Sequence, residues 1–343
     1  MGFWSIPIAI LIFGFLIFIH ELGHFLCARA FGVAINEFSV GMGPKIFKKV
    51  SKRSGIAYSL RALPIGGYVS MVGEDEESEN ENAFYKKAAW KRIIITVAGA
   101  AMNIILGVIL MLVLVLASKT LSSNVIADFT SGALSSRSGL MADDRVVMVG
   151  KTPVHTGNEL AYEVAYRGAK PLDLTVIRNG EKTVLRDVVF ASETNDGLTM
   201  GVPDFRVYAE SKTLGNILKH TFFRSISTVK MIWDSIADLV RGKYGIEAVT
   251  GPVGTTTVIG EVAAKGARQL LYLVVVITMN LGVMNLLPFP ALDGGRLLFL
   301  LIECVIRRPI KKEIEGYINF AGLIILFGLM IFVSVKDILG LFK

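Results

Sequence analysis

Four long apolar stretches divide the chain. They cover residues 3–19, 93–117, about 270–287 and about 318–340. Each is close to the ~20 residues that an α-helix needs to cross the hydrocarbon core of a bilayer. The first stretch has neither the positively charged start nor the small-residue cleavage site of a signal peptide, so we expect it to remain as a helix. The pattern predicts a polytopic α-helical membrane protein with four transmembrane helices.

Lysine and arginine residues gather between the predicted helices. Ten lie in residues 32–92, and five more separate the third apolar stretch from the fourth. Four crossings put these two loops on the same side of the membrane, and an excess of Lys and Arg marks the cytoplasmic side. Both termini and residues 118–267 are then expected outside the cytoplasm. We attribute the net charge of +7 to cytoplasmic loops of this kind rather than to nucleic-acid binding, because Lys and Arg set the orientation of a membrane protein.

The outward segment begins with a region that is typical of a small folded domain. A helix is expected to start near Thr156 or Asn158, and "RNGEK" is typical of a hairpin turn. The β-rich runs lie at residues 144–149, 172–177 and 182–190. Residues 118–212 are therefore predicted to form an extracytoplasmic α+β domain.

Two further segments have recognisable patterns. Residues 213–240 are amphipathic, which predicts a helix on the outer membrane surface within an interfacial segment at 213–267. The alternative is a helix packed on the outward domain. Residues 36–71 are predicted to form two β-ribbons punctuated by glycine. The acidic tract at 73–82 is expected to be a solvated linker.

The stretch "FIHELGHF" places three ionisable side chains inside the first predicted helix. Such groups are costly within a membrane and usually mark function. Residues four apart share a helix face, so His20 and His24 can hold one Zn²⁺ while Glu21 addresses the metal-bound water. The alternative is two buried histidines that hydrogen-bond to their neighbours. The membrane setting makes that alternative costly, and we therefore predict a metal site.

A catalytic zinc needs a third protein ligand. His155 and His220 lie in the outward domain and the amphipathic segment, where both are poorly placed. Asp293 in "NLLPFPALDGGR" is the better candidate, because the prolines and glycines around it break a helix at membrane depth. The alternative is a cytoplasmic turn with a solvated aspartate.

Several motifs together resemble one family. "HELGH", "NLLPFPALDGG", "YSLRALPIGGYVSMVGED" and "AFYKKAAWKRIIITVAGAAMN" are similar to the site-2 protease family of intramembrane zinc metalloproteases (peptidase M50), in particular its bacterial RseP/RasP type. The resemblance covers nearly the whole chain. "SGLMADDRVVMVGKTPV" resembles a PDZ pattern, although residues 142–143 and 149–151 depart from it.

The resemblance implies a role for each site residue. It makes Glu21 the catalytic base and His20, His24 and Asp293 the ligands of Zn²⁺. It implies that part of the 36–71 segment enters the membrane from the cytoplasmic side as a re-entrant β-hairpin. An edge strand there can pair with an extended substrate. The residues that the resemblance places in contact with substrate are Asn285, Pro288, Pro290, Gly66 and Gly67.

The implied function is cleavage of single-pass transmembrane proteins, such as anti-sigma factors or signal-peptide remnants, in the bacterial inner membrane. An upstream site-1 protease would act on the same substrate and need not bind this chain. The PDZ-like domain would exclude substrates with bulky outer domains. The first alternative is a catalytically inactive, PDZ-bearing membrane scaffold, and the second is a metal transporter.

Other features change this picture little. The chain is 52% hydrophobic, as a membrane protein can be. Cys27 and Cys304 suggest neither a disulfide framework nor a zinc knuckle. Asn103, between Gly99 and Gly107 at four-residue spacing, favours close helix packing, with a role at the active site as the alternative. The chain is therefore predicted to divide into six segments. They are the first transmembrane helix (1–31), the cytoplasmic-side β-hairpin region with the acidic linker (32–92), the second transmembrane helix (93–117), the outward domain (118–212), the interfacial segment (213–267) and the third and fourth transmembrane helices (268–343).

Overall fold

The computed structural model describes residues 4–74, 76, 78–195, 198–243, 245, 249–308 and 310–340. It divides into two compact units, each described here by itself. The first, the membrane unit, comprises Met1–Leu110 and Ser235–Lys343, and the second, the sheet unit, comprises Met111–Asp234. Residues 75 and 77 of the predicted acidic linker lie outside the described residues.

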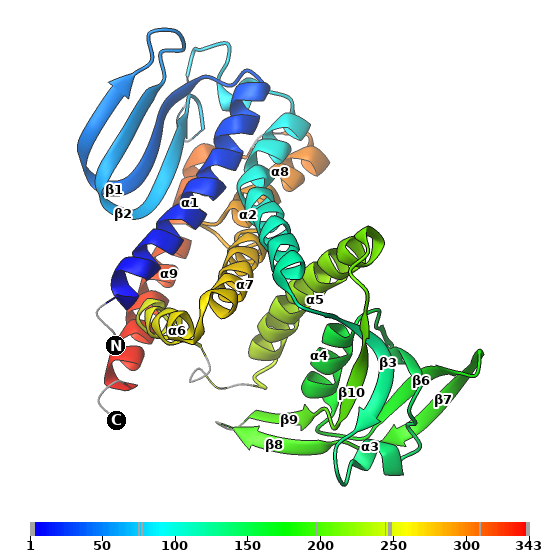
Figure 1. Ribbon diagram of the computed structural model, residues 1–343. Coiled ribbons are helices and arrows are strands. Elements are labelled where there is room, and N and C mark those ends of the chain that lie inside the picture. The colour runs from blue at the N-terminus through cyan, green and yellow to red at the C-terminus, as the bar shows by residue number, and fades with distance from the viewer. Residues whose placement is uncertain are drawn as a thin grey trace. The chain divides into compact units, whose positions relative to one another are not determined.

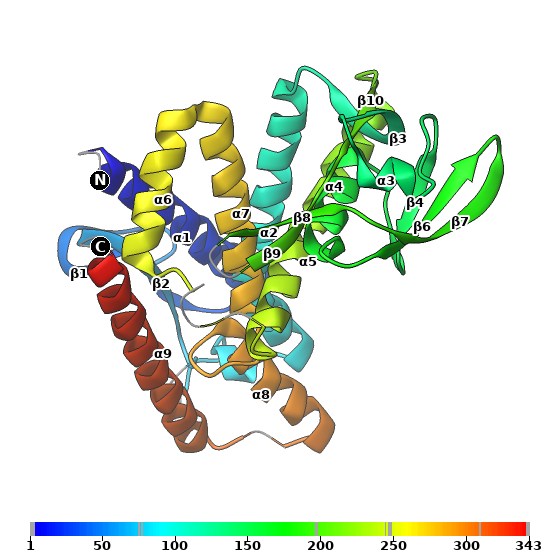
Figure 2. The ribbon, with the colours of Figure 1, turned by 90° about the horizontal axis from the view of Figure 1, so that it is seen from below.

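Among the described residues, four helices have the length and apolar composition to cross a membrane (Figures 1 and 2). They confirm the four predicted spans at the level of length and composition. They are α1 (Ser5–Ala30), α2 (Ala89–Ala117), α7 (Ala267–Asn285) and α9 (Lys312–Gly340).

Two shorter helices and one turn of 3-10 helix complete the membrane unit. The helix α6 (Pro252–Lys265) starts with proline at its first turn and packs beside α1, α7 and α9. The helix α8 (Asp293–Ile306) was not predicted as a separate element, because the broken segment was assigned only as the end of a span. The 3-10 turn covers Phe84–Lys86.

Small residues let α1, α2 and α7 approach closely. Gly23 of α1 faces the Ala98 carbonyl of α2, and Gly282 of α7 faces the Ala100 carbonyl, so a Cβ at either glycine would overlap backbone. Gly107 of α2 lies against Met279 in the same way. Small residues at helix crossings are how membrane helices gain close van der Waals contact. This packing brings the polar residues of α1 next to α2.

A single sheet of two long strands lies beside α1, where two ribbons had been predicted (Figure 1). The strands are β1 (Ile35–Val50) and β2 (Ala57–Met71). Both bend, so that β1 residues 37–40 pair with β2 residues 67–70, while β1 residues 45–50 pair with β2 residues 57–61. Phe25 and Phe38, with ring centroids 5.0 Å apart, help to join the sheet to α1.

The sheet unit is built on an antiparallel six-stranded sheet in the order β10-β3-β4-β6-β7, with β5 beside β4. Its strands are β3 (Leu121–Phe129), β4 (Arg145–Val149), β5 (Thr152–Pro153), β6 (Leu172–Arg178), β7 (Glu181–Val188) and β10 (Phe205–Glu210). A second sheet pairs β8 (Ala191–Asn195) with β9 (Leu198–Val202). Its helices are α3 (Leu134–Arg137), α4 (Gly157–Arg167) and most of α5 (Leu214–Val240).

The predicted strands at 144–149, 172–177 and 182–190 are present as β4, β6 and β7. The predicted start of α4 is also present. Thr156 caps the helix by accepting a hydrogen bond from the Glu159 backbone N–H, and Glu159 in turn accepts one from the His155 backbone N–H. This reciprocal arrangement satisfies two donors at the helix start. Buried residues such as Ile126, Leu160 and Val176 form the core between α4 and the sheet.

One buried ion pair holds β4 to β6. Asp144 is fully buried and accepts two hydrogen bonds of 2.7 Å from the Arg178 guanidinium. It also accepts one from the Met141 backbone N–H at 2.9 Å. The hydrogen bonds from Arg178 to the Asp144 carboxylate raise the pKa of Arg178. We predict that Asp144→Ala destabilises the sheet unit by about 3 kcal/mol, because one charge of the pair is left without its partner.

Hydrogen exchange of the β4 and β6 amides in the detergent-solubilised protein measures this loss. The control is Arg206→Ala, which removes the exposed Arg206–Asp128 pair at 3.6 Å and should cost less than about 1 kcal/mol. Equal protection in Asp144→Ala and the unaltered protein would contradict the prediction.

Candidate metal centre

The helix α1 presents His20 and His24 toward α2, whereas Glu21 lies against Gly67 of β2. His20 and His24 are both buried, with 8% of each residue exposed. Their Nε2 atoms lie 3.2 Å apart, one helical turn from each other. Gly99 of α2 faces both imidazoles, and a Cβ at this position would overlap His24. A glycine is therefore required where α2 passes the two rings.

Asp293 reaches the histidines because the chain turns sharply between α7 and α8. A Cβ on Gly294 would overlap the Leu286 and Leu287 carbonyls, and one on Gly295 would overlap the Phe289 carbonyl. Only glycine permits so tight a return of the chain. The carboxylate Oδ2 of Asp293 then lies 3.2 Å from His20 Nε2 and 3.3 Å from His24 Nε2. The structure thus brings together the three predicted ligands from α1 and α8.

The donor set fits a zinc ion. Asp293 Oδ2 is buried and receives no hydrogen bond of acceptable geometry, although two imidazole nitrogens lie within ion-pair distance. Such an oxygen is left without a partner unless a cation occupies the space between the three atoms. Tetrahedral ligands at zinc distances of ~2.0–2.1 Å lie roughly 3.4 Å from one another. The observed separations of 3.2–3.3 Å are close to that value.

Outer contacts orient both imidazoles. His24 Nδ1 lies 2.8 Å from the Ile95 carbonyl oxygen. Because a carbonyl only accepts, Nδ1 carries the proton and the Nε2 lone pair is available for a metal. On the other ring, His20 Nδ1 lies 3.4 Å from the Asn103 side-chain amide. Asn103 is fully buried and its Oδ1 has no partner.

Turning the Asn103 amide by 180° gives Oδ1 a partner. Oδ1 then faces His20 Nδ1–H and accepts a hydrogen bond from it, and the assignment of amide oxygen and nitrogen rests on such networks. In this orientation His20, like His24, keeps its Nε2 lone pair for a metal. The four-residue spacing of small residues around Asn103 was the only sequence signal for this contact, and it favoured packing. Ile95 and Gly99 carried no recognisable signal of a role at the site.

Glu21 lines a cavity of about 150 Å³ together with both histidines and Asp293. The strand β2 contributes Tyr68, Val69 and Met71 to its wall. The predicted residue Gly67 lies against the Glu21 side chain, and Gly66, with φ of 85°, lies against Met42. Glu21 is thus placed between the candidate ligands and the end of β2.

The remaining predicted residues lie away from the wall of this cavity. Asn285 ends α7, and Pro290 packs against Gly322 of α9. Among the described residues, Asn285, Pro288 and Pro290 do not line the cavity. In the sheet unit, His155 lies beside Glu159 at 3.5 Å and His220 beside Glu210 at 3.0 Å.

Comparison with known proteins identifies the family of this chain. The sequence model of peptidase family M50 matches residues 8–329. A Clostridium acetobutylicum protein, provisionally named a zinc metalloprotease, is 33% identical over 98% of both chains. Zinc metalloprotease RasP of Geobacillus kaustophilus is 27% identical over 97% of both chains. The regulator of sigma-W protease RasP of Bacillus subtilis is 28% identical over 97% of this chain and 98% of its own.

These matches cover nearly the whole chain, including the four candidate membrane spans and the residues of the candidate metal centre. The protein is therefore a multi-pass membrane enzyme of peptidase family M50, a zinc metalloprotease of the site-2 protease family.

Proposed function

We propose that this enzyme cleaves the membrane-spanning segments of single-pass proteins, with His20, His24 and Asp293 as the zinc ligands and Glu21 as the catalytic acid and base. The observation that carries the proposal is the convergence of three ligand atoms within 4.8 Å of one another beside Glu21, with two of them on a helix apolar enough to cross a membrane. Ionisable groups are retained at such a position for function.

The roles of the residues follow from their places. Bound zinc supplies a Lewis acid that polarises the scissile carbonyl and lowers the pKa of water. Glu21 takes the proton of the attacking water as its oxygen bonds to the carbonyl carbon. Glu21 then delivers that proton to the amide nitrogen as the C–N bond breaks, which releases a carboxylic acid and an amine. The Ile95 carbonyl and the Asn103 amide hold the two imidazoles in the required tautomer.

The end of β2 is suited to hold the substrate in an extended form. Residues 67–70 pair with β1 on one side only, and no other described strand pairs with them. Tyr68 and Val69 also line the cavity that contains Glu21. A helical peptide bond is already hydrogen-bonded, so pairing with a strand edge would expose it to attack. The part of β1 and β2 nearest this edge would enter the membrane as the re-entrant hairpin.

We assign the active site to the cytoplasmic side of a bacterial inner membrane, because the basic segments 32–92 and 307–312 flank it in sequence. The sheet unit would then be extracytoplasmic. Its helix α4 and its β-rich core are compatible with a PDZ-like domain. Gly168 at the end of α4 touches Gly201 of β9 so closely that a Cβ on Gly201 would overlap it. This close approach favours a size filter over peptide binding between α4 and β9. Substrates would include anti-sigma factors or signal-peptide remnants already trimmed by a site-1 protease.

The first test is zinc content and cleavage in the purified protein. We expect one zinc per chain, which His20→Ala and Asp293→Ala lose without unfolding. Glu21→Gln should keep the zinc and lower the cleavage rate of a single-pass substrate by at least about 100-fold, the contribution typical of a general acid and base. His155→Ala, in the sheet unit, is the matched control. It should keep both its zinc and its cleavage rate. A metal-free native protein that takes up no zinc, or full cleavage by Glu21→Gln, would contradict the proposal.

Asn103 should set zinc affinity through His20. We expect Asn103→Leu to weaken zinc binding by about 10- to 100-fold, the usual effect of removing an outer partner of a metal-binding histidine. Asn103→Asp keeps an acceptor oxygen and should retain most of the affinity. Thr278→Val removes the neighbouring hydrogen bond to the Asn103 carbonyl, 3.1 Å long, and controls for packing alone. Equal zinc affinity in Asn103→Leu and Thr278→Val, measured by chelator competition, would leave Asn103 with a packing role only.

Strand pairing makes a prediction about cross-links. Single cysteines at Tyr68 and Ser70, in a Glu21→Gln protein whose Cys27 and Cys304 are replaced by serine, should form disulfides with cysteines scanned along the substrate. Cross-linking should repeat every second substrate residue, because alternate side chains of a strand share a face. A repeat of three to four residues would mean that the substrate stays helical, against the proposed pairing.

A further inference from the structure

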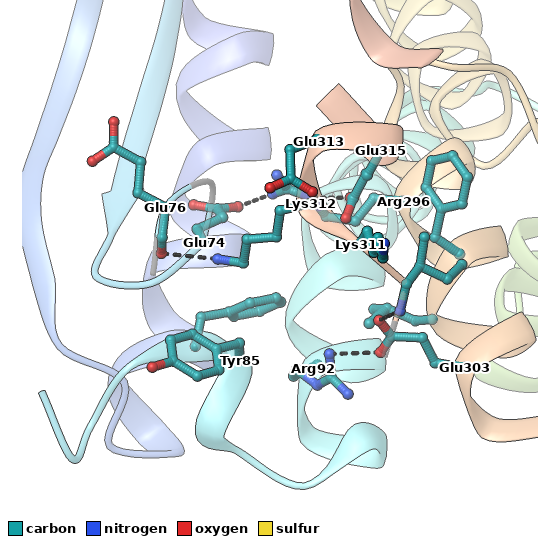
Figure 3. A pocket seen from close by; sticks show the side chains of 14 residues that line it. Glu74, Glu76, Tyr85, Arg92, Arg296, Glu303, Lys311, Lys312, Glu313 and Glu315 are labelled. Atoms are coloured by element: carbon teal, nitrogen blue, oxygen red, sulfur yellow. Dashed lines mark hydrogen bonds and ion pairs between the residues drawn. The ribbon is translucent and has the colours of Figure 1, made fainter. Parts of the chain in front are cut away.

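Arg296 and Glu74 line the cavity of about 150 Å³ that contains Glu21, which we call the catalytic cavity. The two side chains form an ion pair, and Arg296 Nε also lies 3.7 Å from Glu315 Oε1 (Figure 3). The same pair lines a second cavity, of about 840 Å³, whose walls include charged residues of α8 and α9. The reaction proposed above gives this pair no role.

Arg296 lies beside the candidate metal ligand of α8. Asp293 begins this helix and Arg296 follows three residues later. Side chains three residues apart on a helix are neighbours, with about 5–6 Å between their Cβ atoms. Both side chains line the catalytic cavity. Because one water takes about 30 Å³ in the liquid, this cavity has room for roughly five, and a peptide group inside it would contact several walls at once.

Hydrolysis of a peptide bond creates a negative charge in this space. As the oxygen of water bonds to the carbonyl carbon, the carbonyl π electrons move to the carbonyl oxygen. A donor that is already fixed beside this oxygen stabilises the transition state more than the substrate, because the charge develops only during the reaction. Among the described residues that line the catalytic cavity, Arg296 is the one lysine or arginine.

The other donors in the lining are less suited to this task. The Tyr68 hydroxyl lies 2.5 Å from Arg61 Nη2, and it also hydrogen-bonds to Glu37 of β1. It is thus held toward the polar side chains of the β1–β2 sheet. Thr96 offers a neutral hydroxyl, whereas a hydrogen bond from a charged donor is roughly twice as strong. The permanent positive charge of Arg296 therefore fits the developing oxyanion best.

The carboxylates around Arg296 fix its guanidinium before substrate binds. Only 12% of the Glu74 side chain and 25% of the Arg296 side chain are exposed. A guanidinium carries five N–H donors in a rigid fork, so ion pairs along one edge determine the direction of the other donors. Glu74 and Glu315 also offset a positive charge that lies close to a candidate cation site. The ion pairs thus make an arginine acceptable beside the metal ligands.

A purely structural role for the Arg296–Glu74 pair is the alternative. The pair joins α8 to the turn after β2. Lys312 of α9 already holds this turn by donating to the Gly73 and Glu76 carbonyls at 3.2 and 2.8 Å. A second tie to the same turn does not require an arginine that reaches the catalytic cavity.

We propose that Arg296 is a catalytic residue, whose guanidinium donates a hydrogen bond to the scissile carbonyl oxygen as that oxygen becomes negative. The inference rests on the proposed function, because it takes the scissile bond to lie beside Glu21. Glu21 takes the proton of water while the oxyanion forms. When the C–N bond breaks, the electron pair returns to re-form the carbonyl and Glu21 delivers its proton to the nitrogen. Arg296 keeps its own protons throughout.

The test removes the guanidinium together with its partner's charge, so that no carboxylate of the pair is left behind. The double substitution Arg296→Gln with Glu74→Gln, in the full-length zinc-loaded enzyme in nanodiscs, should lower kcat for a single-pass substrate by about 100- to 1,000-fold, the effect of losing one oxyanion donor. KM should change little, because the interaction is made only in the transition state. Zinc content should be unchanged.

The matched control removes an ion pair between α2 and α8 outside the lining of the catalytic cavity. Arg92 and Glu303 lie 2.9 Å apart, and Arg92→Gln with Glu303→Gln should keep kcat. Arg296→Lys retains the charge without the fork and should lose less activity than the neutral pair. If the Arg296→Gln, Glu74→Gln enzyme matched this control in kcat, or lost zinc in proportion to its activity, Arg296 would have a structural role only.

Binding of a transition-state analogue provides a readout without turnover. A phosphinic peptide carries a tetrahedral, negatively charged group in place of the scissile bond, and such analogues report transition-state contacts. We expect the Arg296→Gln, Glu74→Gln enzyme to bind it more weakly by a factor close to the loss in kcat, and to bind the uncleaved substrate as before in a Glu21→Gln background. Equal affinity for the phosphinic peptide would overturn the inference. Weaker phosphinic binding in an enzyme that cleaves no membrane-spanning substrate would uphold Arg296 and refute the proposed function.

Discussion

The free energy cost of placing two histidines and two carboxylates among apolar helices is the constraint on which the membrane unit depends. Asp293 Oδ2 and two imidazole nitrogens lie within 3.3 Å of one another, and the oxygen receives no hydrogen bond of good geometry. A divalent cation turns this unfavourable cluster into a favourable one, since metal-ligand bonds replace the lost hydration. The glycines around the site are explained by the same need, because Gly99, Gly294 and Gly295 stand where side chains would displace a ligand or its supporting turn.

The amino-acid sequence predicted the parts of this arrangement that depend on local spacing. Two histidines four residues apart share a helix face in any helix, and prolines with glycines end a helix wherever they occur, so His20, Glu21, His24 and the broken segment before Asp293 could be found. The strands β4, β6 and β7 were found by their β-rich composition, whereas β3 and β10 lacked so clear a pattern. The contact of Asn103 with His20 joins residues 83 apart, and the cavity lined by charged residues of α8 and α9 joins residues as far apart as Glu74 and Glu315. Neither leaves a periodic signal, because both arise only when the helices pack.

The central claim is that two imidazoles from α1 and one carboxylate from α8 bind the same zinc ion. X-ray absorption spectroscopy at the zinc edge, on the detergent-solubilised native enzyme, tests it most directly. The account predicts four nitrogen or oxygen ligands at about 2.0–2.1 Å, with the scattering pattern of two imidazoles, and a loss of bound zinc in Asp293→Ala. A sulfur ligand at about 2.3 Å, which would implicate Cys27 or Cys304, or a site with one or three imidazoles, would contradict it.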